Sequence, residues 1–191
     1  MISGAFDFFR QRSVDLALSG IAVVLGVVAL ATLDLLTAIF AFVFAALTLH
    51  VVKTDLEKFE ISDYTVVAIF VVGVAFVIFV ADDPAPELLH AISRSVVAGG
   101  VLVAIGAAYR LKRKVEGLGW GDIKLAAAGA VWLSWQQMPF ALLLAASAGI
   151  VLVVVHALRE GKRPTAQMAL PFGTVLAPAI WLVWFAGTLE F

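Results

Sequence analysis

Long apolar runs recur along this chain, and they constrain its fold more than any other feature. A helix needs about 20 apolar residues to cross roughly 30 Å of hydrocarbon, and this chain is 63% hydrophobic and only 14% charged. One run is short, so it needs local thinning of the bilayer, a re-entrant path or shelter among neighbouring helices. We therefore expect an all-α polytopic membrane protein. Its predicted crossings are seven: residues 16–33, 35–52, 64–81, 91–111, 123–135 (the short run), 140–158 and 168–189.

Basic residues give these crossings an orientation, because Lys and Arg in short loops stay on the cytoplasmic side. The opposite turns are acidic or uncharged, apart from nearby Arg94. This alternation predicts a cytoplasmic N-terminus, an external C-terminus and a place in the inner membrane. A cleavable signal peptide is a competing interpretation of the first run. The basic residues precede the first run and follow the second, fourth and sixth: Arg10, Arg12, Lys53, Lys58, Arg110, Lys112, Arg113, Lys114, Arg159, Lys162 and Arg163.

Composition excludes several classes of function. The net charge of −1 argues against binding to nucleic acid. The absence of cysteine excludes disulfides, a thiolate nucleophile and Cys-ligated zinc. His50, His90 and His156 lie far apart without the spacing of metal ligands. We expect neither a metal nor a cofactor.

Two acids fall at the cytoplasmic ends of predicted crossings. Asp55 follows the second and Asp122 precedes the fifth. Two carboxylates that share a proton can activate water and protonate a leaving amine, because each charge opposes ionisation of the other. Asp34 also lies between apolar runs, but the alternation of crossings places it on the outer side. A structural interpretation competes, in which Asp122 only caps its helix.

The segment around Asp122 resembles the aspartic prepilin peptidases, whose second catalytic acid lies in G-x-G-D-x-K-L. The first acid of that family lies in D-x5-I-P-N/D, and a P-F-G or P-Y-G opens the last helix. In this chain Ser62 takes the place of the proline, which leaves the shape of that turn open. The matching residues are Gly119, Gly121, Asp122, Lys124 and Leu125, then Asp55, Ile61 and Asp63, and finally Pro171, Phe172 and Gly173.

The resemblance implies a fold, an activity and a substrate. It covers residues 35–191, a peptidase core preceded by an extra helix in 1–34, within one transmembrane domain over 1–191. It implies an aspartic endopeptidase with Asp55 and Asp122 as catalytic acids and Asp63 near the substrate. The expected partners are the lipid bilayer and a prepilin-like protein with a basic leader and an apolar helix, cut on the cytoplasmic side. Because cysteine is absent, we expect no methyl transfer. The sequence leaves the oligomeric state open.

Two other functions remain as alternatives. A presenilin-like intramembrane protease shares G-x-G-D, but it places its first acid in a Y-D motif and has P-A-L near its end. Here Thr54 precedes Asp55, and Phe172 follows Pro171. A transporter or assembly protein without enzymatic activity would use Asp122 as an ion relay or as a structural cap.

Side-chain size and helix geometry give three further predictions. Small residues in 126–130 and 145–149 allow close helix approach, which predicts a central fifth helix. Lys124 lies two residues after Asp122, and such residues do not face each other on a helix, so Lys124 should reach the membrane interface or a neighbouring helix. Four tryptophans near predicted outer helix ends are typical of interfacial anchors: Trp132, Trp135, Trp181 and Trp184.

Overall fold

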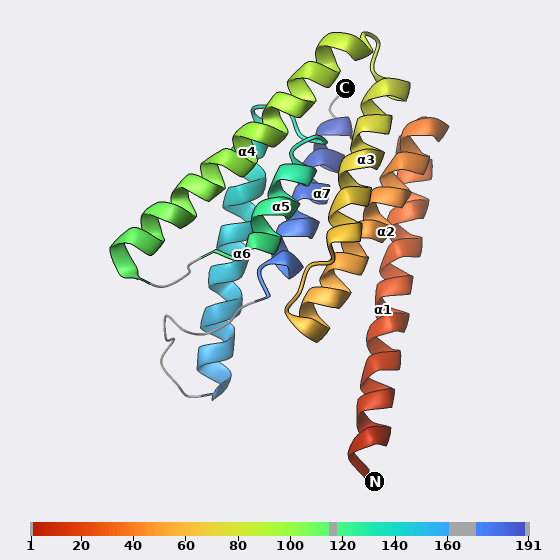
Figure 1. Cartoon of the computed structure of the whole chain (residues 1–191). Helices are drawn as coiled ribbons and strands as arrows, with labels where there is room; N and C mark the ends of the chain where they lie inside the picture. Colours follow the sequence, from red (N-terminus) through yellow and green to blue (C-terminus); the bar gives the residue numbers. More distant parts are fainter. Residues whose placement is uncertain (1, 115–117, 161–170, 190–191) are drawn as a thin grey trace.

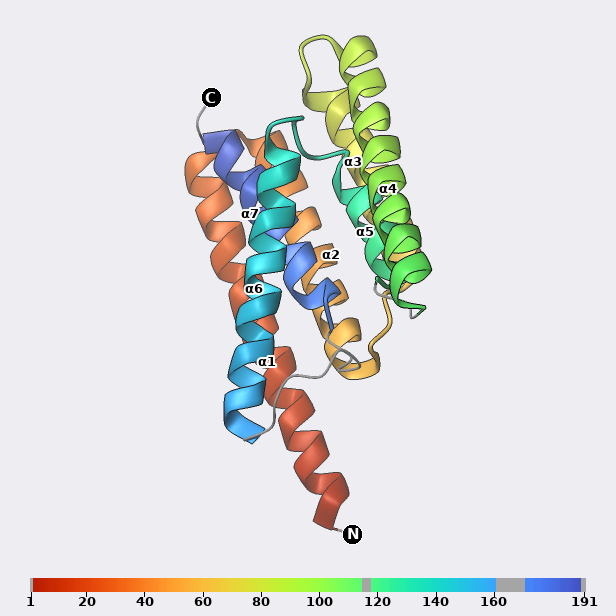
Figure 2. The same ribbon diagram turned by 90° about the vertical axis from the view of Figure 1, so that its left-hand side faces the viewer.

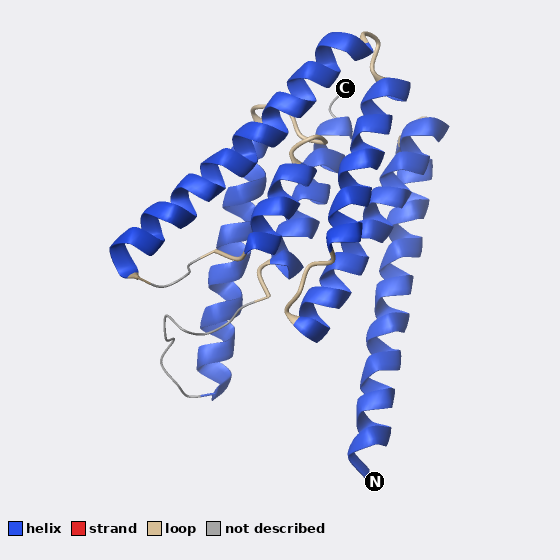
Figure 3. Ribbon diagram, in the orientation of Figure 1, coloured by secondary structure: helices blue, strands red, loops and turns tan. Residues whose placement is uncertain are grey.

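The chain folds as a bundle of α-helices, as the apolar runs predicted (Figures 1 and 3). The computed structural model describes residues 2–114, 118–160 and 171–189. Within these ranges all regular structure is helical, in the order α1 (Ile2–Thr32), α2 (Leu35–Lys58), α3 (Asp63–Val80), α4 (Pro84–Arg113), α5 (Trp120–Gly129), α6 (Gln137–Glu160) and α7 (Gly173–Leu189).

Four of these helices are long and apolar enough to cross a membrane: α2, α3, α4 and α6. The apolar part of α1, residues 17–32, and the whole of α7 are shorter, and α5 has only ten residues. The all-α fold is thus confirmed, whereas the count of seven crossings and the cytoplasmic N-terminus stay predictions.

Several helix limits differ from those expected. α4 begins at Pro84, whereas the predicted crossing began at residue 91. Proline suits the first position of a helix, because the N–H group that it lacks would have no partner there. Residues 84–87, which the sequence assigned to an outer turn, therefore form the first turn of α4. Glu87 in this turn forms an ion pair at 2.7 Å with Arg94, two turns further along the same helix. α5 ends at Gly129, before the predicted limit of 135. The predicted start of the last crossing, 168–170, lies outside the described residues.

The short helix α5 is central, as its small residues predicted. It packs against α3, α4 and α7, while α2 packs against α1, α3 and α7 (Figure 2). A Cβ atom at Gly129 would come within 2.6 Å of the Ile180 side chain, and one at Gly99 within 3.2 Å of the Ala127 Cβ. These contacts bring α5 close to α7 and to α4.

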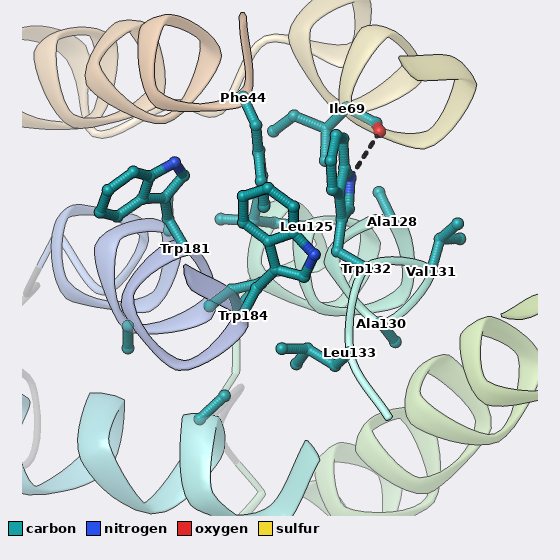
Figure 4. Packing of buried hydrophobic residues seen from close by; sticks show 14 of the residues in the cluster. Phe44, Ile69, Leu125, Ala128, Ala130, Val131, Trp132, Leu133, Trp181 and Trp184 are labelled. Atoms are coloured by element: carbon teal, nitrogen blue, oxygen red, sulfur yellow. Dashed lines mark hydrogen bonds between the residues drawn. The ribbon is translucent and has the colours of Figure 1, made fainter. Parts of the chain in front are cut away.

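Three of the four tryptophans are core residues, so that their prediction as interfacial anchors is wrong. Trp132, Trp181 and Trp184 are at most 4% exposed. Trp132 stacks on Phe44 with ring centroids 4.1 Å apart, and its indole N–H donates to the carbonyl oxygen of Ile69 at 3.0 Å (Figure 4). The hydropathy pattern missed this because burial of an indole requires a nearby acceptor, which here comes from a distant helix.

Candidate active site

Asp55 lies in the last turn of α2 and is held by the first turn of α7. Its side chain is 4% exposed. Its Oδ2 atom accepts hydrogen bonds from the backbone N–H of Thr174 at 2.7 Å and from the Thr174 hydroxyl at 3.1 Å. The N-terminus of a helix has free N–H groups and a partial positive charge, both of which favour a carboxylate. Thr174, which directly follows the P-F-G segment, thus provides both donors to the acid on α2.

Ser62, which takes the place of the family's proline in the turn after Asp55, has a backbone φ that proline could also adopt. Phe59 ends α2 in the left-handed region, with φ 54°, and its N–H donates to the carbonyl oxygen of Asp55. Ser62 has φ −65° and ψ 125°. A proline ring fixes φ at about −65°. Serine therefore adopts here the backbone conformation that proline would impose.

Ile61 packs between the two glycine-containing motifs. A Cβ atom at Gly121 would lie 3.2 Å from the Ile61 Cβ, and one at Gly173 would lie 2.7 Å from the Ile61 Cδ1 and 3.0 Å from Oδ2 of Asp55. The two glycines are needed because a larger residue would displace Ile61 or the acid. One apolar side chain thereby contacts the start of α5 and the start of α7.

Asp122 lies in the first turn of α5, close enough to Asp55 for the two charges to interact. The N-cap position is taken by Gly119, so the alternative in which Asp122 is the N-cap is wrong. Asp122 lies instead three positions later, where an acid can accept the backbone N–H of the cap residue, and a backbone hydrogen bond from Gly119 acts in this way. The acid therefore supports its helix without being its N-cap.

The environment of Asp122 favours its protonated form. The residue lies outside the four helices that are long enough to span a membrane. Burial raises its pKa most, the negative charge of Asp55 raises it further, and the hydrogen bond from Gly119 lowers it, which leaves the pKa at about 6. Two carboxylates that lie close together can share one proton, because each charge opposes ionisation of the other.

The remaining motif residues lie around this pair. Lys124 points away from Asp122, and its Nζ atom forms an ion pair with Oδ1 of Asp63 at 2.8 Å. Both of these side chains are largely exposed. The pair joins the first turn of α5 to the first residue of α3. Pro171 precedes α7, which begins at Gly173.

Asp34 lies at the opposite end of α2 from Asp55. Its Oδ2 atom accepts the N–H groups of Leu36 and Thr37, each at 3.1 Å, so that it caps the start of α2. Among the described residues, no group of three or more His, Asp or Glu side chains lies close enough together to hold a metal ion.

Thr174 is the site residue that the sequence interpretation missed. It follows the P-F-G segment directly, and a hydroxyl residue in the first turn of a helix is common for reasons of capping alone. Its contact with Asp55 spans 119 positions in the sequence. The only indication of this role in the sequence was the position of Thr174, a polar residue directly after the P-F-G segment that opens α7.

Comparisons of the sequence with known proteins identify the family of this chain. The model of the type IV leader peptidase family matches residues 42–154, which include both acids. Leader peptidase HopD of Escherichia coli is 38% identical over 96 residues, which are 50% of this chain and 61% of that protein. A prepilin leader peptidase/N-methyltransferase of Burkholderia pseudomallei is 40% identical over 80 residues, 42% of this chain and 25% of the relative.

The chain therefore covers less than two thirds of the length of these curated relatives. No solved structure matches. With four apolar helices and a family match over more than half of its length, the chain is a membrane protein that belongs to the type IV leader peptidase family.

Proposed function

We propose that this protein is an aspartic endopeptidase that removes the basic leader from prepilin-like proteins. The observation that supports the proposal is that burial and the negative charge of Asp55, on a helix far away in the sequence, raise the pKa of Asp122 to about 6. The family match and the names of the relatives, which are leader peptidases, support the same activity.

In the proposed mechanism Asp122 carries the shared proton and Asp55 is the base. Asp55 takes a proton from water while the water oxygen attacks the scissile carbonyl carbon, and Asp122 gives its proton to the carbonyl oxygen. Collapse of the tetrahedral diol breaks the C–N bond: one hydroxyl returns its proton to Asp122 as the C=O bond forms, and the amine leaves with the proton held by Asp55, so both acids regain their starting states. Thr174 keeps Oδ2 of Asp55 in place throughout, because both of its hydrogen bonds end on that atom.

Charged groups of both signs lie beside the site. Glu57 and Glu60 are exposed in the segment that follows Asp55, and Lys58 is exposed between them. The two acidic groups attract a cationic leader, whereas Lys58 offsets part of that attraction. We further propose that this end of the bundle faces the cytoplasm in the inner membrane, since the basic termini of alternate helices share that end. A leader at the inner surface would then lie over the two acids.

Co-expression of the chain with prepilins tests the proposal. Wild type should shorten a prepilin by the length of its leader, seen as a gel shift, whereas Asp122→Asn should leave it uncut. Asp34→Asn serves as the matched control, because Asp34 caps the far end of α2 and should retain cleavage. Cleavage by Asp122→Asn, or none by a folded and inserted wild type, would refute the proposed activity.

A further inference from the structure

Ile61 lies in the turn between α2 and α3 and packs inward, whereas most of its neighbours in that turn do not. Residues 56–60 and 63–64 are exposed, but Ile61 is half-buried and packs against the hydrophobic core. The turn lies at the end of the bundle where α5 and α7 begin (Figures 1 and 2). Because Ile61 belongs to no helix, its side chain is held by what it packs against rather than by helical hydrogen bonds.

The side chain of Ile61 packs against the glycine that precedes each acid-holding residue. Its Cβ atom lies 3.2 Å from the place of a Cβ atom on Gly121, and its Cδ1 atom lies 2.7 Å from the place of one on Gly173. Gly121 is followed by Asp122, and Gly173 is followed by Thr174, which donates two hydrogen bonds to the other acid. Different atoms of one stiff, β-branched side chain thus pack against both helix starts.

The main chain on either side of Ile61 is tied to the helices that carry the two acids. The N–H of Phe59 donates to the carbonyl oxygen of Asp55 at 2.9 Å, and Asp63 forms its ion pair with Lys124 of α5 at 2.8 Å. The turn therefore connects the helix end that carries one acid to the helix start that carries the other. A side chain that projects inward from such a turn fixes a separation, because close-packed interiors leave few voids into which helices can shift.

The other end of the same helix pair supplies a comparison. There Ile180 of α7 packs on Gly129, the last residue of α5, and its Cδ1 atom lies 2.6 Å from the place of a Cβ atom on that glycine. Both isoleucines therefore pack against glycines of α5, one beside the acids and one at the far end of the helix. Ile180 is 3% exposed, so its contribution to packing should be at least as large as that of Ile61.

We propose that Ile61 is a positioning residue for cleavage, which sets the separation of Asp55 and Asp122 through its contacts with the starts of α5 and α7. This inference rests on the proposed peptidase function and deepens it. Ile61 touches neither the water nor the scissile bond in this role and acts only through the two helix starts. A displacement of about 1 Å between reacting groups can lower a rate roughly 10²-fold. Loss of Ile61 should therefore reduce kcat and leave KM unchanged.

Truncation of the two isoleucines tests the inference. With the full chain in liposomes and a prepilin as substrate, Ile61→Ala should lower kcat about tenfold or more and leave KM within about twofold. Ile61→Val, which keeps the branched Cβ atom, should recover most of that rate. Ile180→Ala is the matched control, because it should lower Tm at least as much while kcat changes about twofold or less. Equal kcat losses from Ile61→Ala and Ile180→Ala, a change in KM alone, or no recovery by valine would overturn the inference.

A measurement without turnover separates this inference from the proposed activity. The chain has no cysteine, so Asp55→Cys/Asp122→Cys places thiols at the two acid positions alone. A short bifunctional thiol reagent should join them in the otherwise unchanged chain, less in the Ile61→Ala background and equally in the Ile180→Ala background, as read by mass spectrometry. Equal joining in all three backgrounds, or joining in none, would overturn the inference while cleavage by wild type still upheld the activity. No cleavage by wild type, with the thiol result as expected, would overturn the activity and leave Ile61 as a structural contact.

Discussion

The end of α2 and the start of α5 each present one acid to the site, but the fold holds them in different ways. Asp55 is 4% exposed, and two donors of Thr174 fix one of its oxygens. Asp122 is half-buried, and its hydrogen bond comes from Gly119 in its own helix turn. Asp55 is thus fixed by a contact between α2 and α7, which are far apart in the sequence but packed together. Asp122 is positioned by the backbone of its own helix turn.

This difference teaches that the two acids carry different structural duties. Removal of Asp55 would leave the part-buried donors of Thr174 without this partner, and a fully buried donor left unpaired costs about 1–3 kcal/mol. Removal of Asp122 takes away a carboxylate whose charged form is disfavoured by burial and by Asp55. The proposed mechanism requires both acids, one as base and one as proton donor, whereas their contributions to the stability of the fold at pH 7 should have opposite signs.

The largest expected effect comes from removing either acid. Asp55→Ala and Asp122→Ala should each lower cleavage of a prepilin by roughly 10³-fold or more, because neither acid can replace the other. Thermal unfolding in detergent should separate them, with a lower Tm for Asp55→Ala and no loss for Asp122→Ala at pH 7. Equal destabilisation by the two variants would contradict the difference described for the two helix ends.

The pH dependence of cleavage should follow Asp122. Its pKa is raised from 3.8 to about 6, so the proposed acid loses its proton as pH rises through 6. The rate should then fall up to tenfold per pH unit above that point. The folded state binds this proton more tightly than the unfolded state does, so the stabilisation from protonation is complete below 3.8 and is lost as pH approaches 6.

A neutral variant tests the sign of this stability effect. The Tm of Asp122→Asn relative to wild type should rise between pH 4 and pH 6.5 and then stay level. Asp34→Asn is a useful comparison, because hydrogen bonds in its cap lower the pKa of Asp34. The charged form of Asp34 stabilises the fold, and this stabilisation grows as pH rises from the lowered pKa toward 3.8. Asp34→Asn should therefore lower Tm more at pH values above 3.8 than in stronger acid. A flat difference for Asp122→Asn would show that its proton is not linked to folding.

The glycines around Ile61 should give the next largest effect. Gly173→Ala would bring a Cβ atom within 2.7 Å of Ile61 and 3.0 Å of Asp55. We expect a loss of roughly 1–3 kcal/mol, typical of overpacking, together with reduced cleavage. Shortening the neighbour in Gly173→Ala/Ile61→Val should restore part of the loss. Gly100→Ala, which meets nothing within 4 Å, is the control.

The sequence predicted the fold class correctly, and its assignment of Asp55 and Asp122 as catalytic acids stays a prediction, but it did not predict the contacts around Asp55. Apolar runs reveal helices because hydrocarbon requires every backbone group to bond within its own segment. The predicted topology placed Asp55 and Asp122 at the same end of the bundle. Motif spacing indicated the same two residues. The contact of Thr174 with Asp55 was not predictable, since it joins residues 119 positions apart and depends on how α7 packs against α2.

The position of the four tryptophans near predicted helix ends also gave the wrong location for three of them, which are buried. Trp132 and Trp181 are buried, and each finds a backbone carbonyl as acceptor, on Ile69 and Ala41 respectively. A scale that ranks residues one at a time cannot know that a helix elsewhere provides such an acceptor. The early end of α5 at Gly129 has a related origin, because the chain turns there and Trp132 enters the core.

The smallest expected effect concerns the ion pair between Lys124 on α5 and Asp63 at the start of α3. Lys124 and Asp63 are 2.8 Å apart but largely exposed, and exposed pairs contribute about 0–1 kcal/mol. Lys124→Ala should therefore change Tm little and lower kcat/KM only a few-fold, by loosening α5 relative to the turn that carries Ile61. The charge-reversed double variant Asp63→Lys/Lys124→Asp should recover that loss, whereas either reversal alone should not. A double variant no better than the single ones would mean that Lys124 acts on substrate or lipid, and that the start of α5 is positioned by its glycines and by Ile61 alone.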